Sequence, residues 1–336
     1  TVLTPIYEAD FLGFSYGYRP GRSQHRALDA LATGILTRRI GWILDADIQA
    51  FFDTIPHEPL LILIKKRIGD KRVLRLISKW LKTGYSEDGT IHRQTEGTPQ
   101  GSVISPLLAN IYLHYALDEW VENERRTRPN GAVIIVRYAD DTVLGFQYKS
   151  EAERFLTAMR ERLAEFGLTL HPEKTRLIEF GRYAAERRKR RGEGKPDNFN
   201  FLGFTHLCSV TRKGGYFLKR QTIGKRLRQT VRDITETLRK TLHEPVNQIG
   251  NWLKSVVQGF GLYFGVPGNH KALKTFRDLV VKAWFKSLRR RSQKGTAMTW
   301  RRFTPIVDAY IPRLRICHEF PEVRFFATTQ GKSRMR

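Results

Sequence analysis

Two β-rich segments flank a pair of adjacent aspartates, and this arrangement restricts the fold more than any other feature of the sequence. The segments cover residues 133–136 and 142–144, and the aspartates are Asp140 and Asp141. Branched apolar residues on both sides of a short polar turn predict a β-hairpin with carboxylates at its tip. An Asp-Asp pair is also common in ordinary turns, so the dipeptide alone does not identify a site.

A third aspartate makes a metal site the better interpretation. Asp47 ends a short predicted strand over residues 41–48. Adjacent carboxylates at the end of central strands repel each other unless a cation compensates. Carboxylate oxygens suit Mg²⁺, and two such ions can stabilise the attacking and leaving oxygens of a phosphoryl transfer. The sequence therefore predicts a Mg²⁺ site at Asp47, Asp140 and Asp141.

The charge of the chain is strongly uneven. The 336 residues contain 59 Lys and Arg against 33 Asp and Glu, which gives a net charge of +26. Residues 1–180 contain 24 basic and 23 acidic side chains, whereas residues 181–336 contain 35 and 10. Self-repulsion on this scale disfavours a compact domain unless a polyanion neutralises it. The second part of the chain is therefore expected to bind nucleic acid.

The composition argues against several other classes. A hydrophobic fraction of 40% is typical of a globular chain rather than a disordered one. The sequence has no apolar run long enough for a membrane span and no signal-peptide pattern at its start, so we expect no membrane partner and a cytoplasmic location. Cys208 and Cys317 are too few for a disulfide framework or a zinc cluster.

Periodic patterns predict the elements around the aspartates. Apolar residues at helical spacing predict helices over residues 56–81, 98–120 and 151–166, the last of which ends at Gly167. The basic run over residues 182–195 has no apolar period and is expected to be a solvated loop between domains.

The later residues have a different pattern. Residues 199–204 resemble one more strand and turn, and three helical segments follow. The first of these has an apolar stripe from Ile223 to Leu238 and a basic opposite face. The pattern predicts a small helical domain with a basic exterior.

Six ordered segments resemble the motifs of reverse transcriptases. Tyr138-Ala139-Asp140-Asp141 matches the catalytic YxDD box, in the Ala form common to group II intron-encoded proteins. Residues 47–53 resemble the first aspartate motif, and residues 98–110 resemble the signature of the nucleotide-side helix. The remaining similar segments are the fingers motif at 16–23 and the later palm motifs at 168–176 and 201–204. The sequence thus resembles a bacterial-type group II intron reverse transcriptase/maturase without an endonuclease domain.

The resemblance implies an α+β fold of the right-hand polymerase type. Fingers and palm would consist of an antiparallel sheet with packed helices, and an α-helical thumb/maturase domain would follow. The expected boundaries are 1–205 for partial fingers and palm, 206–300 for the thumb/maturase, and 301–336 for a basic C-terminal extension.

The resemblance also implies roles around the nucleotide. The backbone carbonyl of Ile48 would join Asp47, Asp140 and Asp141 in binding two Mg²⁺ ions, with Mn²⁺ able to replace them. Phe52 would exclude a ribose 2′-hydroxyl. The incoming nucleotide would be lined by Gln100 and Gly101, with Lys174 near the leaving pyrophosphate.

The implied nucleic-acid contacts lie in three parts of the chain. They comprise two arginines of the fingers motif, the primer-holding segment and the basic helix. These residues are Arg19, Arg22, Phe201, Leu202, Gly203, Lys225, Arg226, Arg228 and Arg232.

The implied function is RNA-directed DNA synthesis for a group II intron, with intron RNA binding that assists splicing and mobility. The expected partners are intron RNA, an RNA template with a DNA primer, dNTPs and a DNA target, in a bacterial cytoplasm. One alternative is a non-catalytic splicing maturase, which the intact aspartates and Gln100 disfavour. Another is a host-defence or diversity-generating bacterial reverse transcriptase, which the maturase-like segment over residues 221–303 disfavours.

Overall fold

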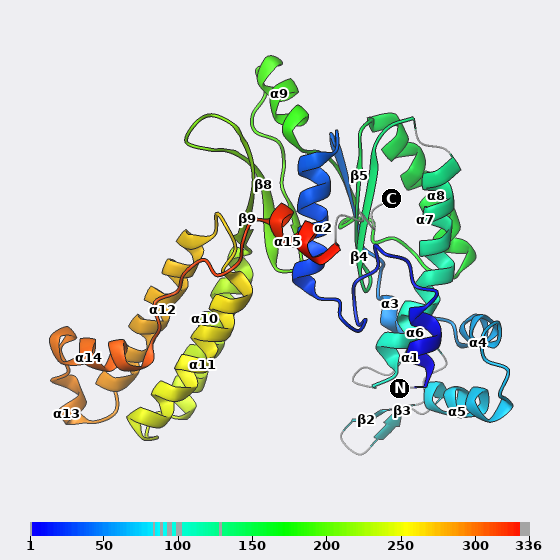
Figure 1. The fold of residues 1–336 in the computed structure, drawn as a ribbon. Helices are drawn as coiled ribbons and strands as arrows, with labels where there is room; N and C mark the ends of the chain where they lie inside the picture. The colour runs from blue at the N-terminus through cyan, green and yellow to red at the C-terminus, as the bar shows by residue number, and fades with distance from the viewer. Residues whose placement is uncertain are drawn as a thin grey trace. The chain divides into compact units, whose positions relative to one another are not determined.

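The computed structural model describes residues 2–82, 85–87, 90–92, 96–98, 103–127 and 130–329 (Figure 1). The chain forms two compact units, of which the first comprises Thr1–Asp197 together with Phe325–Arg336 and the second comprises Asn198–Arg324. Among the described residues, no helix is both long and apolar enough to cross a membrane.

The first unit is built on a four-stranded antiparallel sheet in the order β4-β5-β1-β6. Its strands are β1 (Trp42–Ala46), β4 (Val133–Tyr138), β5 (Asp141–Phe146) and β6 (Arg176–Glu179). A separate pair of short strands consists of β2 (Tyr85–Glu87) and β3 (Thr90–His92).

Helices of the first unit cover both faces of the sheet. They are α1 (Leu3–Glu8), α2 (Gln24–Thr37), α3 (Phe51–Thr54), α4 (His57–Lys65), α5 (Lys71–Lys82), α6 (Ser105–Leu113), the π-helix η1 (His114–Asp118), α7 (Glu119–Thr127), α8 (Lys149–Glu165) and α9 (Arg182–Arg190). Helix α2 lies on one face, and α8 lies on the other (Figure 1).

Strand alternation determines which side chains meet each helix layer. Ile135, Leu144 and Phe146 point into the main apolar core with α6 and α8. On the opposite face, Ile134 packs so closely against Gly34 of α2 that a Cβ on this glycine would lie 2.9 Å from the isoleucine side chain. The central strands are therefore buried on both faces, which explains their almost continuous apolar sequences.

The second unit combines a small sheet with a group of helices. Its antiparallel strands are β7 (Phe199–Phe201), β8 (Phe204–Val210) and β9 (Tyr216–Thr222). The following helices are α10 (Gly224–Lys240), α11 (Val246–Phe264), α12 (His270–Arg289), α13 (Gln293–Thr296) and α14 (Trp300–Tyr310), and α15 (Pro321–Thr329) ends the described chain. Phe260 of α11 stacks on Phe276 of α12 with their ring centroids 3.6 Å apart. These aromatic residues lie in the core of the helical group.

The structure confirms the α+β fold class, the hairpin and the helix that ends before Gly167. The other predicted helical regions differ in detail. The segment over residues 56–81 forms two helices, because the Asp70 carboxylate accepts hydrogen bonds from the backbone of Arg72 and Val73 and begins α5. The region predicted from residue 98 is helical from Ser105 to Thr127, with the π-helix in its middle.

The prediction for the basic segment that follows the sheet is wrong. Residues 182–195 are not a loop throughout, since α9 occupies Arg182–Arg190. Ion pairs stabilise this helix, although its sequence has no apolar period. Arg187 and Arg191 both contact Glu179 at the end of β6. Residues 206–222 lie before the first predicted helix, and they form most of β8 and β9, which join β7 in one sheet.

Candidate active site

Strand register brings the three predicted aspartates to one end of the first unit's sheet. Tyr138 pairs with Asp141, so Ala139 and Asp140 form the turn of the hairpin. Ala46 of β1 pairs with Thr142 of β5, and continuing this register by one residue places Asp47 opposite Asp141. The sequence-distant aspartates therefore meet at the hairpin tip.

The same register places the acidic side chains on one face. Asp45 pairs with Val143, and residues directly opposite each other in a sheet share a face. Because faces alternate along a strand, Asp47 and Asp141 lie on the face that Asp45 occupies. This face is opposite to the one carrying Leu144 and Phe146 into the main core.

The backbone of Asp47 is fixed by the segment that precedes β6. The amide of His171 donates to the Asp47 carbonyl at 2.8 Å, and the amide of Gln49 donates to the Thr169 carbonyl at 2.8 Å. Ile48 bridges Leu170 between these two bonds. In this antiparallel geometry the Ile48 carbonyl points away from Leu170, on the side of β1 where β5 lies. Its predicted position as a metal ligand is therefore compatible with the fold.

The electrostatics of the tip reflect crowded negative charge. Asp141 is exposed at its surface, yet the chain around it removes part of its solvation, and this loss, followed by the charges of Asp140, Asp47 and Asp45, raises its pKa to about 6. Loss of solvation also raises the pKa of Asp140, and the Asp47 charge adds to this effect. A cation would relieve this repulsion, and the all-oxygen donor set suits a hard divalent ion. In the part of the chain that the structure describes, however, no three acidic, His or Cys side chains form a preassembled metal cage.

Lys174 lies within the predicted site. Its Nζ is 3.1 Å from Oδ2 of Asp47, and its side chain is 63% exposed. An exposed ammonium group at this position neutralises part of the aspartate charge and remains accessible to an anionic ligand.

Phe52 also lies close to Asp47 in the chain, on the short helix α3. It is half-buried, and its ring packs edge-on against the buried Phe51 at 5.4 Å. The amide of Thr98 donates to the Phe52 carbonyl at 2.7 Å, which fixes the start of the segment leading to residues 99–102. Gln100 and Gly101 fall outside the described residues.

The guanidinium group of Arg19 is occupied by partners within the protein, and its predicted nucleic-acid contact stays a prediction. The side chain is 3% exposed and forms an ion pair with Glu8 at 2.7 Å. Its remaining donors bind backbone carbonyls, including those of Leu12 at 2.6 Å and Ser15 at 2.8 Å. Arg19 thus stabilises the N-terminal loop. Arg22 is half-exposed and donates to the Gly13 carbonyl, so its predicted contact stays a prediction.

The predicted primer-holding segment forms the turn between β7 and β8. Leu202 and Gly203 both have positive φ values, +46° and +82°, as a two-residue type I′ hairpin turn requires. The Tyr263 hydroxyl donates to the Leu202 carbonyl at 2.8 Å and holds this turn. Phe201 is buried, so its side chain packs rather than facing a ligand.

The basic residues predicted on the first helix of the second unit are exposed. Leu227, Ile234 and Leu238 of α10 point inward. The exposed positions on its other side include Lys225, Arg226, Arg228 and Arg232.

Sequence analysis missed the residues behind the hairpin tip. Arg137 is completely buried and forms an ion pair with Asp118, which is also completely buried. Gly17 lies against the turn, since a Cβ on this glycine would be 2.3 Å from the amide nitrogen of Ala139. The only sequence signal was the occurrence of a charged residue in an otherwise apolar strand.

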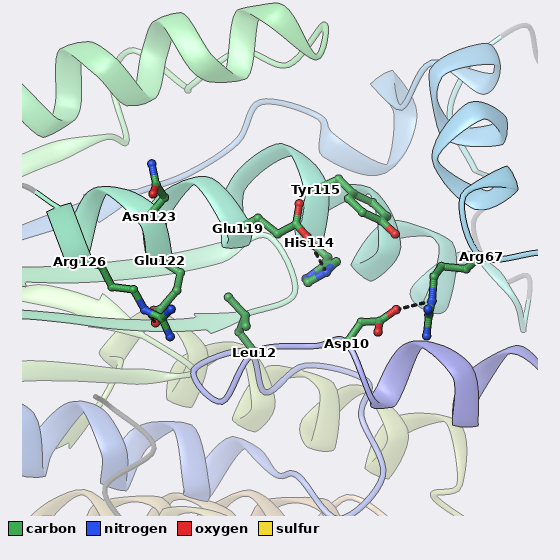
Figure 2. A pocket seen from close by; sticks show the side chains of 9 residues that line it. All are labelled: Asp10, Leu12, Arg67, His114, Tyr115, Glu119, Glu122, Asn123 and Arg126. Atoms are coloured by element: carbon green, nitrogen blue, oxygen red, sulfur yellow. Dashed lines mark hydrogen bonds and ion pairs between the residues drawn. The ribbon is translucent and has the colours of Figure 1, made fainter.

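A cavity of about 510 Å³ lies elsewhere in the first unit (Figure 2). Its walls include η1, α7 and the loop after α1. Charged side chains in this cavity pair with one another, as in the contacts of Asp10 with Arg67 at 2.9 Å and of Glu122 with Arg126 at 2.8 Å. None of the three site aspartates lines it.

Replacing Asp141 by Asn tests the charge crowding. In metal-free protein at a pH of about 7.5, D141N should increase the free energy of unfolding by about 1 kcal/mol, a value reduced for solvent screening because the side chain is exposed. Burying the ionised Asp141 carboxylate costs folding free energy in the wild type, because its folded-state pKa is raised to about 6. This cost is complete above pH 6 and decreases as the pH falls toward the pKa of the unfolded chain, where both states bind the proton. The gain should therefore shrink at lower pH.

Chemical denaturation in EDTA, at a pH of about 7.5 and again at a pH below the folded-state pKa of about 6, measures this effect. Glu153→Gln on the exposed face of α8 is the matched control and should change stability little. Equal stability of D141N and wild type at the higher pH would contradict the crowding.

Comparison with known proteins agrees with this geometry. The family model described as reverse transcriptase (RNA-dependent DNA polymerase) matches residues 1–206. The "Uncharacterized 91 kDa protein in cob intron" of Schizosaccharomyces pombe is 28% identical over 380 residues, which cover 92% of this chain and 45% of that protein. "Group II intron-encoded protein LtrA" of Lactococcus lactis subsp. cremoris is 45% identical over 120 residues, or 36% of this chain and 20% of that protein.

The chain thus spans less than half the length of these two relatives. Among solved structures, a telomerase from Candida albicans in complex with a telomeric RNA fragment aligns with 93% of this chain and 57% of that chain, at 11% identity and a TM-score of 0.46. The family model covers more than half of the present chain and includes all three aspartates. The chain therefore belongs to the reverse transcriptase (RNA-dependent DNA polymerase) family.

Proposed function

We propose that this chain carries the polymerising centre of a group II intron reverse transcriptase, which extends a DNA primer on an RNA template. The observation that supports this proposal best is the register of β1 and β5, which ends at the Ala46–Thr142 pair and, continued by one residue, brings Asp47 opposite Asp141, with Asp140 in the adjoining turn. The relative named as a group II intron-encoded protein favours an intron role over a host-defence role.

In this proposal the three aspartates and the Ile48 carbonyl hold two Mg²⁺ ions, or Mn²⁺ ions in their place. The bound ions would activate the primer 3′-hydroxyl and neutralise the triphosphate. Lys174 would exchange its contact with Asp47 for the phosphate oxygens of the leaving group, which its exposure and flexible stem allow.

Phe52 would act as a steric gate below the sugar of the incoming nucleotide. Packing against Phe51 restricts the ring, and the bond from Thr98 fixes the backbone of α3 at this residue. A ring held in this way excludes a 2′-hydroxyl by contact rather than by hydrogen bonding. Gln100 and Gly101 are proposed to line the same nucleotide.

The second unit would bind RNA through the exposed basic side of α10. Trp284 and Phe264 are buried and belong to the core, whereas Trp300 is 49% exposed and stacked on Phe285. The proposed partners are therefore phosphates for the arginines and unpaired bases for an exposed aromatic residue. Intron RNA is the polyanion that fits the named relative, and splicing assistance, mobility, a DNA target and the bacterial cytoplasm remain proposals.

A splicing maturase without polymerase activity is the second candidate. It is supported by the exposed basic side of α10, which would bind RNA without any metal-binding carboxylate. The two candidates differ in one measurable property, because only the polymerase needs the carboxylates of the tip.

Replacing Asp140 by Ala separates them. Primer extension on an RNA template with Mg²⁺ and dNTPs should fall by at least about 100-fold, because the variant lacks a metal-binding carboxylate. Binding of structured RNA should change less than about twofold, since the exposed basic residues are untouched. Extension by D140A at the wild-type rate would refute the metal assignment, and an inactive wild type with tight RNA binding would support the maturase.

Replacing Phe52 by Ala tests the gate. The variant should incorporate ribonucleotides at least about tenfold better relative to dNTPs, because a methyl group no longer contacts the 2′-hydroxyl. Competing dNTP and rNTP incorporation on one template measures the ratio. Phe51→Leu is the control, since the buried neighbour should affect stability without changing sugar selection. Unchanged selectivity in F52A would return this residue to a packing role.

Neutralising the exposed side of α10 tests RNA binding by the second unit. The test variant carries K225Q, R228Q and R232Q. The slope of log affinity against log salt should become shallower by about 0.7–0.9 for each phosphate that the variant no longer neutralises. The control removes three exposed charges from α8 with K149Q, R154Q and R160Q. Equal slopes in both variants would contradict the proposed surface.

A further inference from the structure

The guanidinium of Arg137 uses all five of its N–H donors inside the first unit. Nε and one terminal nitrogen bind the two carboxylate oxygens of Asp118 at 2.7 and 2.5 Å. The same terminal nitrogen donates to Ser15 Oγ at 2.7 Å. The other terminal nitrogen donates to the Ala139 carbonyl at 2.8 Å and to Asn110 Oδ1 at 3.1 Å. The planar fork therefore fixes four partners at defined angles.

The Ala139 carbonyl is the partner that connects this group to the aspartates. Ala139 has a φ of +57°, a left-handed conformation that is unfavourable for a residue with a side chain. Its carbonyl belongs to the peptide plane that leads into Asp140. Fixing this oxygen therefore fixes the direction in which the chain enters Asp140 and then Asp141.

A second contact holds the same turn from its amide side. Gly17 approaches Ala139 so closely that a Cβ would lie 2.3 Å from the Ala139 nitrogen. The Gly17 carbonyl accepts a 2.7 Å hydrogen bond from the side-chain amide of Asn110 on α6. Asn110 thus contacts both Arg137 and Gly17, and it ties the turn to helix α6.

The π-helix η1 supplies the counter-charge. It ends at Asp118, between the two α-helices α6 and α7. A π-helical turn contains an extra residue, which changes the direction of the following side chains relative to a continuous α-helix. Asp118 and Arg137 are both fully buried as a result of this arrangement.

Stability alone does not explain such a pair. The desolvation cost of two buried charges offsets most of their attraction, and well-packed apolar residues often stabilise a fold equally well. A buried ion pair with a high desolvation cost and little net stabilisation is expected where the direction of a hydrogen bond matters for the site. The directed bond in this case is the one to Ala139, next to the site aspartates.

We propose that Arg137 is a positioning residue for the nucleotidyl-transfer reaction, holding the Ala139 carbonyl so that Asp140 and Asp141 keep their orientation relative to α6. This inference rests on the proposed polymerase function. Asp118 orients Arg137. Asn110 connects α6, the predicted nucleotide-side helix, to the turn through its hydrogen bonds with Arg137 and Gly17.

The test compares two variants with wild type. R137K keeps a positive charge but cannot form the planar fork, and the double variant R137M/D118L replaces the ion pair by apolar groups of similar size. Both should slow extension at saturating dNTP and primer by about 10- to 100-fold, as expected for a small misplacement of reacting groups. Both should also need more Mg²⁺ for half-maximal rate, while template–primer affinity changes less than about twofold.

Structural damage is separated from positioning by a matched control and by thermal unfolding. Glu122→Gln on α7 removes a carboxylate that pairs with Arg125 and Arg126 and that is not one of the four partners of Arg137 described above. It should leave the rate and the Mg²⁺ midpoint unchanged. The double variant should unfold within a few degrees of wild type and still be slow. A double variant as active as wild type, or a decrease in rate that follows the unfolded fraction with an unchanged Mg²⁺ midpoint, overturns the proposal.

Failure of the proposed function gives a different result. In that case wild type would not extend a primer, or D140A would extend it as well as wild type does. The Arg137 inference is judged only by comparing the extension rate and the Mg²⁺ midpoint of its variants with those of a wild type that is active and depends on Asp140.

Discussion

Three like charges held at one end of a sheet are the constraint on which the site depends. Asp47, Asp140 and Asp141 repel one another, and the raised pKa of Asp141 reflects first its loss of solvation and then this repulsion. A chain can keep such groups together only if other interactions fix its backbone. The bonds from the segment before β6 fix Asp47, and the close approach of Gly17 and the Arg137 fork fix the turn. The remaining repulsion is the property that a divalent cation would neutralise.

Charge is distributed unevenly along the chain, and the division does not coincide with the two units, because residues 181–197 belong to the first unit. Residues 1–180, which include the carboxylates, have nearly equal numbers of acidic and basic side chains, whereas residues 181–336 carry almost all of the excess positive charge. A strongly basic surface beside the site would compete with Mg²⁺ for the same carboxylates. In the second unit such a surface can instead contact phosphates along a nucleic acid, while buried aromatic residues such as Phe260 and Phe276 supply the core.

Several features that the sequence did not reveal share one cause, which is that a charged side chain looks the same in sequence whether it faces water or protein. Arg19 belongs to a motif associated with ligand contact, yet its donors are used by Glu8 and by backbone carbonyls. The run that forms α9 has no apolar period, and its Arg187 and Arg191 converge on a single glutamate. Arg137 was overlooked for the same reason, since its partner Asp118 lies on a different element.

The sequence by itself determined the hairpin, the acidic composition of its tip, the amphipathic helices and the basic character of the second unit. These features depend on local periodicity and residue type, both of which can be recognised in the order of residues along the chain. Tertiary structure alone decided that Asp47 lies opposite Asp141, that Ala139 adopts a left-handed conformation under Gly17, and that Asp118 meets Arg137 from a π-helix. These contacts join segments far apart in the chain, and their geometry depends on register and burial, neither of which a residue's neighbours in sequence specify.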